Sequence, residues 1–188
     1  DFFMGLQTVH HVVPNAEQEA SEGSESRFIN GRTAMYFNSR RSVTTFRESI
    51  KFDWDVAALP QNKTEATILH SDGYCMPSAA KNKDVAWTFI EFANSVEGQT
   101  IIAGTGRTVP SLKAVANSPA FLDPNAKPAH SQVFLDVIPT IRALPAVAKW
   151  AEIEDAANEE LSRGFFGEAA IYEAMLRAVE RTREYFLP

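Results

Sequence analysis

The chain has too few strand-like segments for the number of helices that its pattern predicts. Residues 32–37, 54–59 and the interrupted stretch 67–77 suggest strands, and the second of these alternates large apolar residues with small or polar ones. Asn30-Gly31 marks a turn before the first strand, and Pro60 ends the second. Such scattered strands do not make a self-sufficient sheet among many helices. We therefore expect a fragment, whose sheet is completed by strands that lie elsewhere.

Helices are predicted along most of the remaining sequence. An amphipathic helix begins after Asn82, and a second begins at Ser95 or Glu97 and ends at Gly104 and Gly106. In the C-terminal third, Pro145 stands at a first helical position and Gly164 lies past the end of that helix. The other predicted helices cover residues 1–11, 15–28, 44–50, 131–141, 145–163 and 168–186.

Composition excludes several classes of protein. The 188 residues are 45% hydrophobic, with 13 Phe, 4 Tyr and 3 Trp, which argues against disorder. The net charge of −6 disfavours nucleic-acid binding, which needs clustered Lys and Arg. No apolar run approaches the roughly 18 residues of a membrane-spanning helix. The sequence begins at Asp1 without a targeting signal, which indicates a processed protein or a piece of one.

Motifs for metals and cofactors are weak. A single cysteine, Cys75, excludes an internal disulfide and a C-x-x-C metal site, and the adjacent His10 and His11 do not share a helix face. The glycines of residues 104–106 lack the third glycine and the preceding strand of a dinucleotide fingerprint, and there is no P-loop. We expect no cofactor and no metal.

Two adjacent arginines, Arg40 and Arg41, follow the predicted strand 32–37 in the stretch NGRTAMYFNSRRSV. Arginine pairs are common on solvated surfaces, and on these residues alone a surface position is the better interpretation. A polar cluster where a strand meets a loop is also where α/β proteins hold ligands. A ligand contact at this point is therefore the alternative.

Four sequence phrases, taken in order, resemble one known family. They are FINGRTAM (28–35), FDWDVAALP (52–60), DGYCMPSAAKNKDVAWTFIEFANSVEGQ (72–99) and TGRTVPS (105–111). They are similar to phrases of the extracellular solute-binding proteins of carbohydrate ABC importers, of the family 1 type. The resemblance covers most of residues 28–111 and corresponds to the C-terminal half of such proteins.

The resemblance implies an α/β chain that forms the helix-rich C-terminal portion of a two-lobed periplasmic-binding-protein fold of type II. It implies that residues 1–52 belong to the C-terminal lobe, 53–98 return to the N-terminal lobe, and 99–188 come back to the C-terminal lobe. Solute binds between the lobes, which close by a hinge motion. The implied partners are a sugar, a related polyol or a sugar acid, the ABC permease and the missing N-terminal half. The implied location is periplasmic or extracellular, with a lipid anchor in some organisms, and no enzymatic activity is expected.

The candidate ligand-binding residues follow from the same resemblance. Family members often place a sugar-stacking aromatic near Arg41, an apolar or aromatic residue at Arg107, and an aromatic at a tail position similar to Trp150. Each also has a structural alternative: a solvated charge, a turn, or core packing. The candidates are Asn38, Ser39, Arg40, Arg41, Asp72, Gly73, Tyr74, Arg107 and Trp150.

Two choices remain open at this point. A neutral sugar ranks above an anionic solute, because sugar sites also use arginine and because Asp72 can offset the positive charge. A hydrolase or transferase that uses His70, Asp72 and Cys75 in a cleft is the second class of function. Catalytic groups usually come from separated segments, so the crowding of residues 70–75 is no evidence for it.

Overall fold

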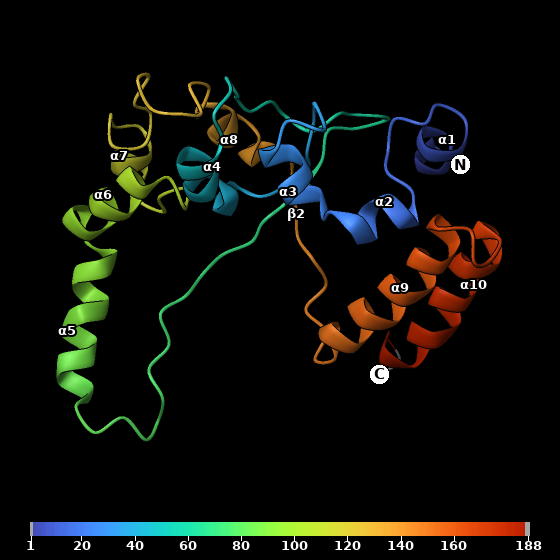
Figure 1. Cartoon of the computed structure of the whole chain (residues 1–188). Helices are drawn as coiled ribbons and strands as arrows, with labels where there is room; N and C mark the ends of the chain where they lie inside the picture. Colours follow the sequence, from blue (N-terminus) through green and yellow to red (C-terminus); the bar gives the residue numbers. More distant parts are fainter. Residues whose placement is uncertain (1, 187–188) are drawn as a thin grey trace. The chain divides into compact units, whose positions relative to one another are not determined.

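The computed structural model describes residues 2–186 and divides the chain into two compact units (Figure 1). Unit 1 takes the residues up to Ser26 and those from Pro145 onward, and unit 2 takes Arg27–Leu144. None of the helices among the described residues is long and apolar enough to cross a membrane.

Unit 1 contains α1 (Phe2–Thr8), α2 (Ala16–Ser21) and a hairpin of two long helices, α9 (Trp150–Phe165) and α10 (Ile171–Thr182), followed by the 3-10 turn η3 (Arg183–Phe186). Figure 1 shows α9 and α10 side by side. Gly164 permits this close packing, because a Cβ there would lie 2.8 Å from Cδ1 of Ile171 and 2.9 Å from Cβ of Ala174. The small residues Ala174 and Ala178 are buried at the same interface.

A charged network also joins the two helices of the hairpin. Glu160 is 4% exposed and accepts hydrogen bonds from Arg163 at 3.0 Å and from Arg181 at 2.8 Å. Arg181 also donates to Glu159 at 2.7 Å, and this hydrogen bond lowers the pKa of the Glu159 carboxyl. The buried carboxylate thus has two guanidinium partners, as a buried charge requires.

Unit 2 holds the remaining elements. Its strands β1 (Thr67–Ile68) and β2 (Ile141–Arg142) pair in parallel, with Thr67 opposite Ile141. Its helices are α3 (Ser24–Ile29), which begins at the boundary with unit 1, η1 (Arg40–Ser42), α4 (Val43–Ser49), α5 (Lys83–Asn94), α6 (Val96–Thr105), α7 (Lys113–Ala116), α8 (Val133–Asp136) and η2 (Ile138–Thr140).

Two hydrophobic clusters hold unit 2 together. The first is built on α4, whose Val43 and Phe46 pack with Ile50 and with Trp54. Phe28 and Tyr36 pack against this cluster, and their rings lie 5.3 Å and 6.3 Å from the ring of Phe46. The second cluster consists of Ala103, Val115 and Phe121, with partly buried neighbours that include Phe134.

The two predicted helices in the middle of the chain are confirmed; Asn82 precedes α5 without a capping hydrogen bond from its side chain, and Gly104 lies inside α6. Ser95 begins α6, since its hydroxyl accepts a hydrogen bond from the amide of Gly98 at 3.2 Å. Gly106 ends α6 in the left-handed conformation, with φ 84°. Gly98 also allows α6 to approach α5, because a Cβ there would lie 2.2 Å from the carbonyl oxygen of Phe92.

The predicted strands were largely wrong. Residues 32–37 and 54–59 form no strand in the part of the chain that the structure describes, and only Thr67–Ile68 of the stretch 67–77 is one. A strand is defined by hydrogen bonds to a neighbouring strand, and the side-chain alternation of residues 54–59 does not supply that neighbour. The aromatic residues of these stretches still serve the core, as Tyr36 and Trp54 show.

Several predicted helix bounds also needed correction. Helix α9 begins at Trp150 rather than Pro145, because residues 143–146 are exposed and no packing stabilises a helical turn there. Gly164 lies inside α9, not beyond it. Residues 15–28 are divided between α2 and α3, and residues 131–141 between α8 and η2.

The apolar face of α5 predicts self-association of the 188-residue chain. Val85, Phe89 and Phe92 share one face of α5 by their helical spacing, and they are 71%, 60% and 44% exposed. Contiguous apolar surface of this kind favours association. Light scattering should give a mass above the 20.8 kDa of one chain. The double variant Val85→Lys, Phe89→Lys should shift the mass toward the monomer, and a wild-type chain that is monomeric at all concentrations would contradict this.

Candidate ligand-binding surface

Asn38 organises the turn that leads into α4. Its side-chain nitrogen donates to the hydroxyl of Ser42 at 2.6 Å and to that of Tyr36 at 3.1 Å, and its side-chain oxygen accepts from the amide of Ser39 at 2.7 Å. Asn38 and Ser39 remain exposed. The turn therefore has a defined shape and presents the next two residues, Arg40 and Arg41, in different directions.

Arg40 is buried, with 6% of its surface exposed. Its guanidinium carbon lies 4.2 Å from the ring centre of Phe121 and 4.8 Å from that of Phe134, and Nη1 donates to the hydroxyl of Ser131 at 3.4 Å. Its Nε and Nη2 are buried without a hydrogen-bond partner in the described chain. Burial, reinforced by the charge of Arg47, lowers the pKa of Arg40 to about 10. Arg40 is thus a core residue in this structure.

The two arginines should respond oppositely to substitution. Arg40→Ala removes the stem and the cation-π contacts between two rings, and should lower the free energy of unfolding by about 2–4 kcal/mol. Arg41→Ala, at an exposed position, should change it by less than about 0.5 kcal/mol. Urea unfolding of the variants measures both values.

A third variant separates packing from charge. Arg40→Met restores apolar volume without the unpaired donors, and should therefore be more stable than Arg40→Ala. Equal stability of the Arg40→Ala and Arg41→Ala variants would show that the buried position of Arg40 is incorrect.

Arg47 fastens α4 to two other segments. Its Nη1 donates to the carbonyl oxygen of Gly104 at 3.1 Å, and its Nε donates to that of Lys127. Thr44 donates to the carbonyl oxygen of Thr105 at 3.3 Å. Partial burial lowers the pKa of Arg47, although the charge of Asp123 opposes this. These contacts bring the beginning of α4 beside the end of α6, where Arg107 is exposed.

The other candidate residues lie apart from this contact. Asp72, Gly73 and Tyr74 are exposed on the stretch between β1 and α5, which Figure 1 shows as a long extended segment. The ring of Tyr74 packs edge-on against Phe89 of α5, 6.0 Å between centres. Trp150 is the half-buried first residue of α9, in unit 1. The contacts within unit 2 therefore bring the stretch of residues 38–41 near Arg107. That any of the candidate residues binds a ligand stays a prediction.

The cluster of His70, Asp72 and Cys75 shows no catalytic arrangement. All three are exposed, and among the described residues neither His70 nor Asp72 forms a hydrogen bond or ion pair. Within residues 2–186 the Cys75 thiol forms one hydrogen bond, to the backbone oxygen of Gly73 at 4.0 Å. Within the same part of the chain, no group of three His, Cys, Asp or Glu residues is placed to hold a metal ion.

Two acid–base pairs that the sequence interpretation missed join residues 53–55 to the loop before α8. Asp53 pairs with Lys127, and Asp55 accepts hydrogen bonds from the ring Nδ1 and the backbone amide of His130. The alternation of FDWDV contains the signal, because it puts both aspartates on the face opposite the buried Trp54. Partial burial alone would raise the pKa of the Asp55 carboxyl. The hydrogen bonds from His130 and from the Val56 amide have the larger combined effect, and the pKa of Asp55 is therefore lowered.

The Asp55–His130 pair should stabilise unit 2 in a pH-dependent way. Because the pKa of Asp55 is lower in the folded chain than its ordinary 3.8, its stabilisation is present above that value and is lost as the pH falls through the folded pKa. Urea unfolding at about pH 5 and about pH 3 should show a larger acid-induced loss for the wild type than for Asp55→Asn. His130→Ala should remove part of this excess, because it removes the ring donor and keeps the backbone amides of residue 130 and Val56, and an identical loss in all three proteins would contradict the prediction.

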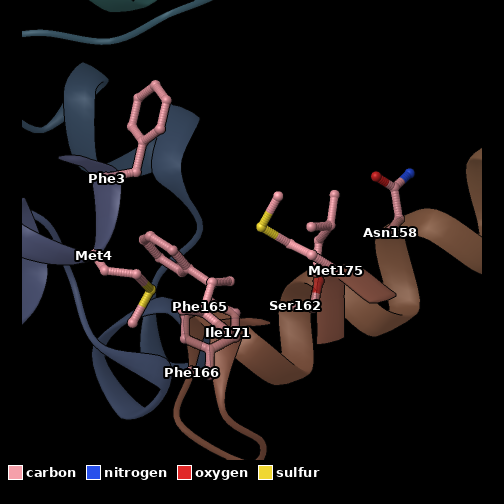
Figure 2. A pocket seen from close by; sticks show the side chains of 9 residues that line it. Phe3, Met4, Asn158, Ser162, Phe165, Phe166, Ile171 and Met175 are labelled. Carbon is pink, nitrogen blue, oxygen red and sulfur yellow. The ribbon is translucent and has the colours of Figure 1, made fainter. Parts of the chain in front are cut away.

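Unit 1 contains an apolar groove of about 590 Å³ (Figure 2). Phe3 and Met4 of α1 lie on one side of it, and Ile171 and Met175 of α10 line the other part. Asn158 and Ser162 of α9 are its polar lining residues. No predicted site residue lines this groove.

Comparison with known proteins identifies the family. A model described as bacterial extracellular solute-binding protein matches residues 6–129, and the chain belongs to this family. The structure is similar to that of the ABC substrate-binding protein Lmo0181 from Listeria monocytogenes in complex with cycloalternan, with a TM-score of 0.81 and 19% sequence identity. The match covers 98% of this chain and 48% of that chain, so this chain spans about half its length. No curated protein sequence matches.

These findings confirm the family resemblance and the fold class. The helix-rich chain has the fold of part of a substrate-binding protein, as expected from the four sequence phrases. The boundaries 1–52, 53–98 and 99–188 between lobes stay a prediction. The two compact units divide the chain at other positions, after Ser26 and before Pro145.

Proposed function

We propose that this chain is the C-terminal half of a receptor that captures a carbohydrate between two lobes and delivers it to an ABC permease. The observation that carries the proposal is the family match over residues 6–129, joined to a shared fold over nearly the whole chain. The similar substrate-binding protein is described in complex with cycloalternan, a carbohydrate, which supports a sugar as solute. The family also supports a location outside the cytoplasmic membrane, periplasmic or extracellular.

The partner of this chain within the receptor is a preceding N-terminal half. A match to only 48% of a substrate-binding protein supports it, and the exposed apolar face of α5 fits the proposal that residues 53–98 pack in the N-terminal lobe. The pairs Asp53–Lys127 and Asp55–His130 then lie at the proposed crossing between lobes near residue 53. They hold the departing chain to the C-terminal lobe while the hinge moves.

A binding role also accounts better than catalysis for the exposed residues 70–75. Hydrolysis needs a base within hydrogen-bonding reach of a nucleophile, and within residues 2–186 the Cys75 thiol hydrogen-bonds to the backbone oxygen of Gly73 and to no side chain. We therefore propose that the receptor releases its solute chemically unchanged.

The test uses the protein expressed from its complete reading frame, with both halves present. Neutral and acidic mono- and oligosaccharides should raise its melting temperature, because a ligand that binds only the folded state stabilises it. Chromatography of each mixture should recover the sugar intact. Absence of stabilisation by every carbohydrate would contradict the receptor, and product formation abolished by Cys75→Ala would establish the hydrolase or transferase instead.

A further inference from the structure

Arg41 and Arg107 flank one contact within unit 2 although they are far apart in the sequence. Thr44 and Arg47 of α4 bond to the carbonyl oxygens of Thr105 and Gly104, and Cγ1 of Val43 lies 2.9 Å from where a Cβ on Gly106 would be. Arg41 is two residues before Val43 in the sequence, and Arg107 is one residue after Gly106. Each backbone is therefore within about 7 Å of chain from the contact point. We call these two residues the arginine pair.

The arginine pair is not engaged by the protein. Both residues are exposed, and neither side chain forms a hydrogen bond or ion pair within residues 2–186. The neighbouring Arg40 and Arg47 are held in the structure by the contacts described above. Each exposed guanidinium therefore offers its five N–H donors to a ligand.

Several acidic residues of unit 2 already interact with basic residues other than the arginine pair, although the chain as a whole has a net charge of −6. Asp123 acts on Arg47, while Asp53 and Asp55 are paired with Lys127 and His130. Asp72, the carboxylate that would offset the arginines, lies on the extended stretch between β1 and α5, and it forms no hydrogen bond or ion pair in the described chain (Figure 1). The charge of the arginine pair is left for a ligand to neutralise.

We propose that the solute is an anionic carbohydrate, a sugar acid or a phosphorylated sugar, whose carboxylate or phosphate is bound by Arg41 and Arg107. This inference rests on the proposed receptor function and narrows its ligand. Sugar hydroxyls both donate and accept hydrogen bonds, whereas arginine only donates. Two guanidinium groups match the paired oxygens of a carboxylate or phosphate, which accept only.

The test is calorimetric titration of the receptor expressed from its complete reading frame. Galacturonate, digalacturonate and glucose 1-phosphate are compared with galactose, glucose and inorganic phosphate. An anionic sugar should bind at least about 10-fold more tightly than its neutral counterpart. Arg41→Ala and Arg107→Ala should each weaken this binding by about 10- to 100-fold, whereas Lys63→Ala, at an exposed loop position, should leave it unchanged.

The other possible results of the titration distinguish failure of the anionic solute, of the arginine contacts and of the receptor function. If neutral sugars bind and the anionic ones bind no better, the receptor function holds and the anionic solute is rejected. If an anionic sugar binds but both arginine variants keep full affinity, the proposed contacts of Arg41 and Arg107 are rejected. Arg41 is then a surface charge, and Arg107 only balances the negative end of α6. Inorganic phosphate that binds as tightly as glucose 1-phosphate would reject a carbohydrate ligand. If no carbohydrate binds at all, the receptor function itself fails.

Discussion

The guanidinium of Arg40 lies between the rings of Phe121 and Phe134 and connects the start of unit 2 to its later segments. Arg40 lies at the start of η1, while Phe121 and Ser131 belong to the segment between α7 and α8 and Phe134 to α8. Arg47, one helix further on, reaches the carbonyl oxygens of Gly104 and Lys127. Two arginines of one short helical region thus connect it to two later parts of the chain, the end of α6 and residues 121–134. The position of every residue from Asn38 to Arg41 depends on these contacts.

Such a role is costly for a charged residue, and the structure shows how the cost is limited. A guanidinium is more weakly hydrated than an ammonium and is attracted to aromatic faces, so burial between two rings is better tolerated than for lysine. Its long apolar stem also fills core volume. Even so, Nε and Nη2 of Arg40 find no partner in the described chain, and its pKa falls to about 10. A buried, uncompensated charge of this kind fixes one arrangement of its neighbours at the expense of stability.

Helices were more predictable from the sequence than strands, for a physical reason. The ends of α6 depend on local signals, and the structure selects Ser95 over Glu97 as the start and Gly106 over Gly104 as the end, each of which was among the predicted residues. Residues 32–37 and 54–59 carry strand-like alternation, but strand formation depends on a neighbour that local sequence does not specify. Trp54 shows what the alternation does encode, since it is buried against Phe46 while the flanking aspartates face Lys127 and His130.

The site could be predicted only as a set of segments. The sequence does not reveal which of two adjacent arginines is buried, because the answer depends on Phe121 and Phe134, far later in the chain. Once Arg40 occupies that interior position, Arg41 at the next residue points away from the core and is exposed. The contact of α4 with the end of α6 then places Arg107 nearby. A buried arginine therefore positions an exposed one, and the adjacent pair that looked redundant in the sequence divides into a structural residue and a candidate ligand contact.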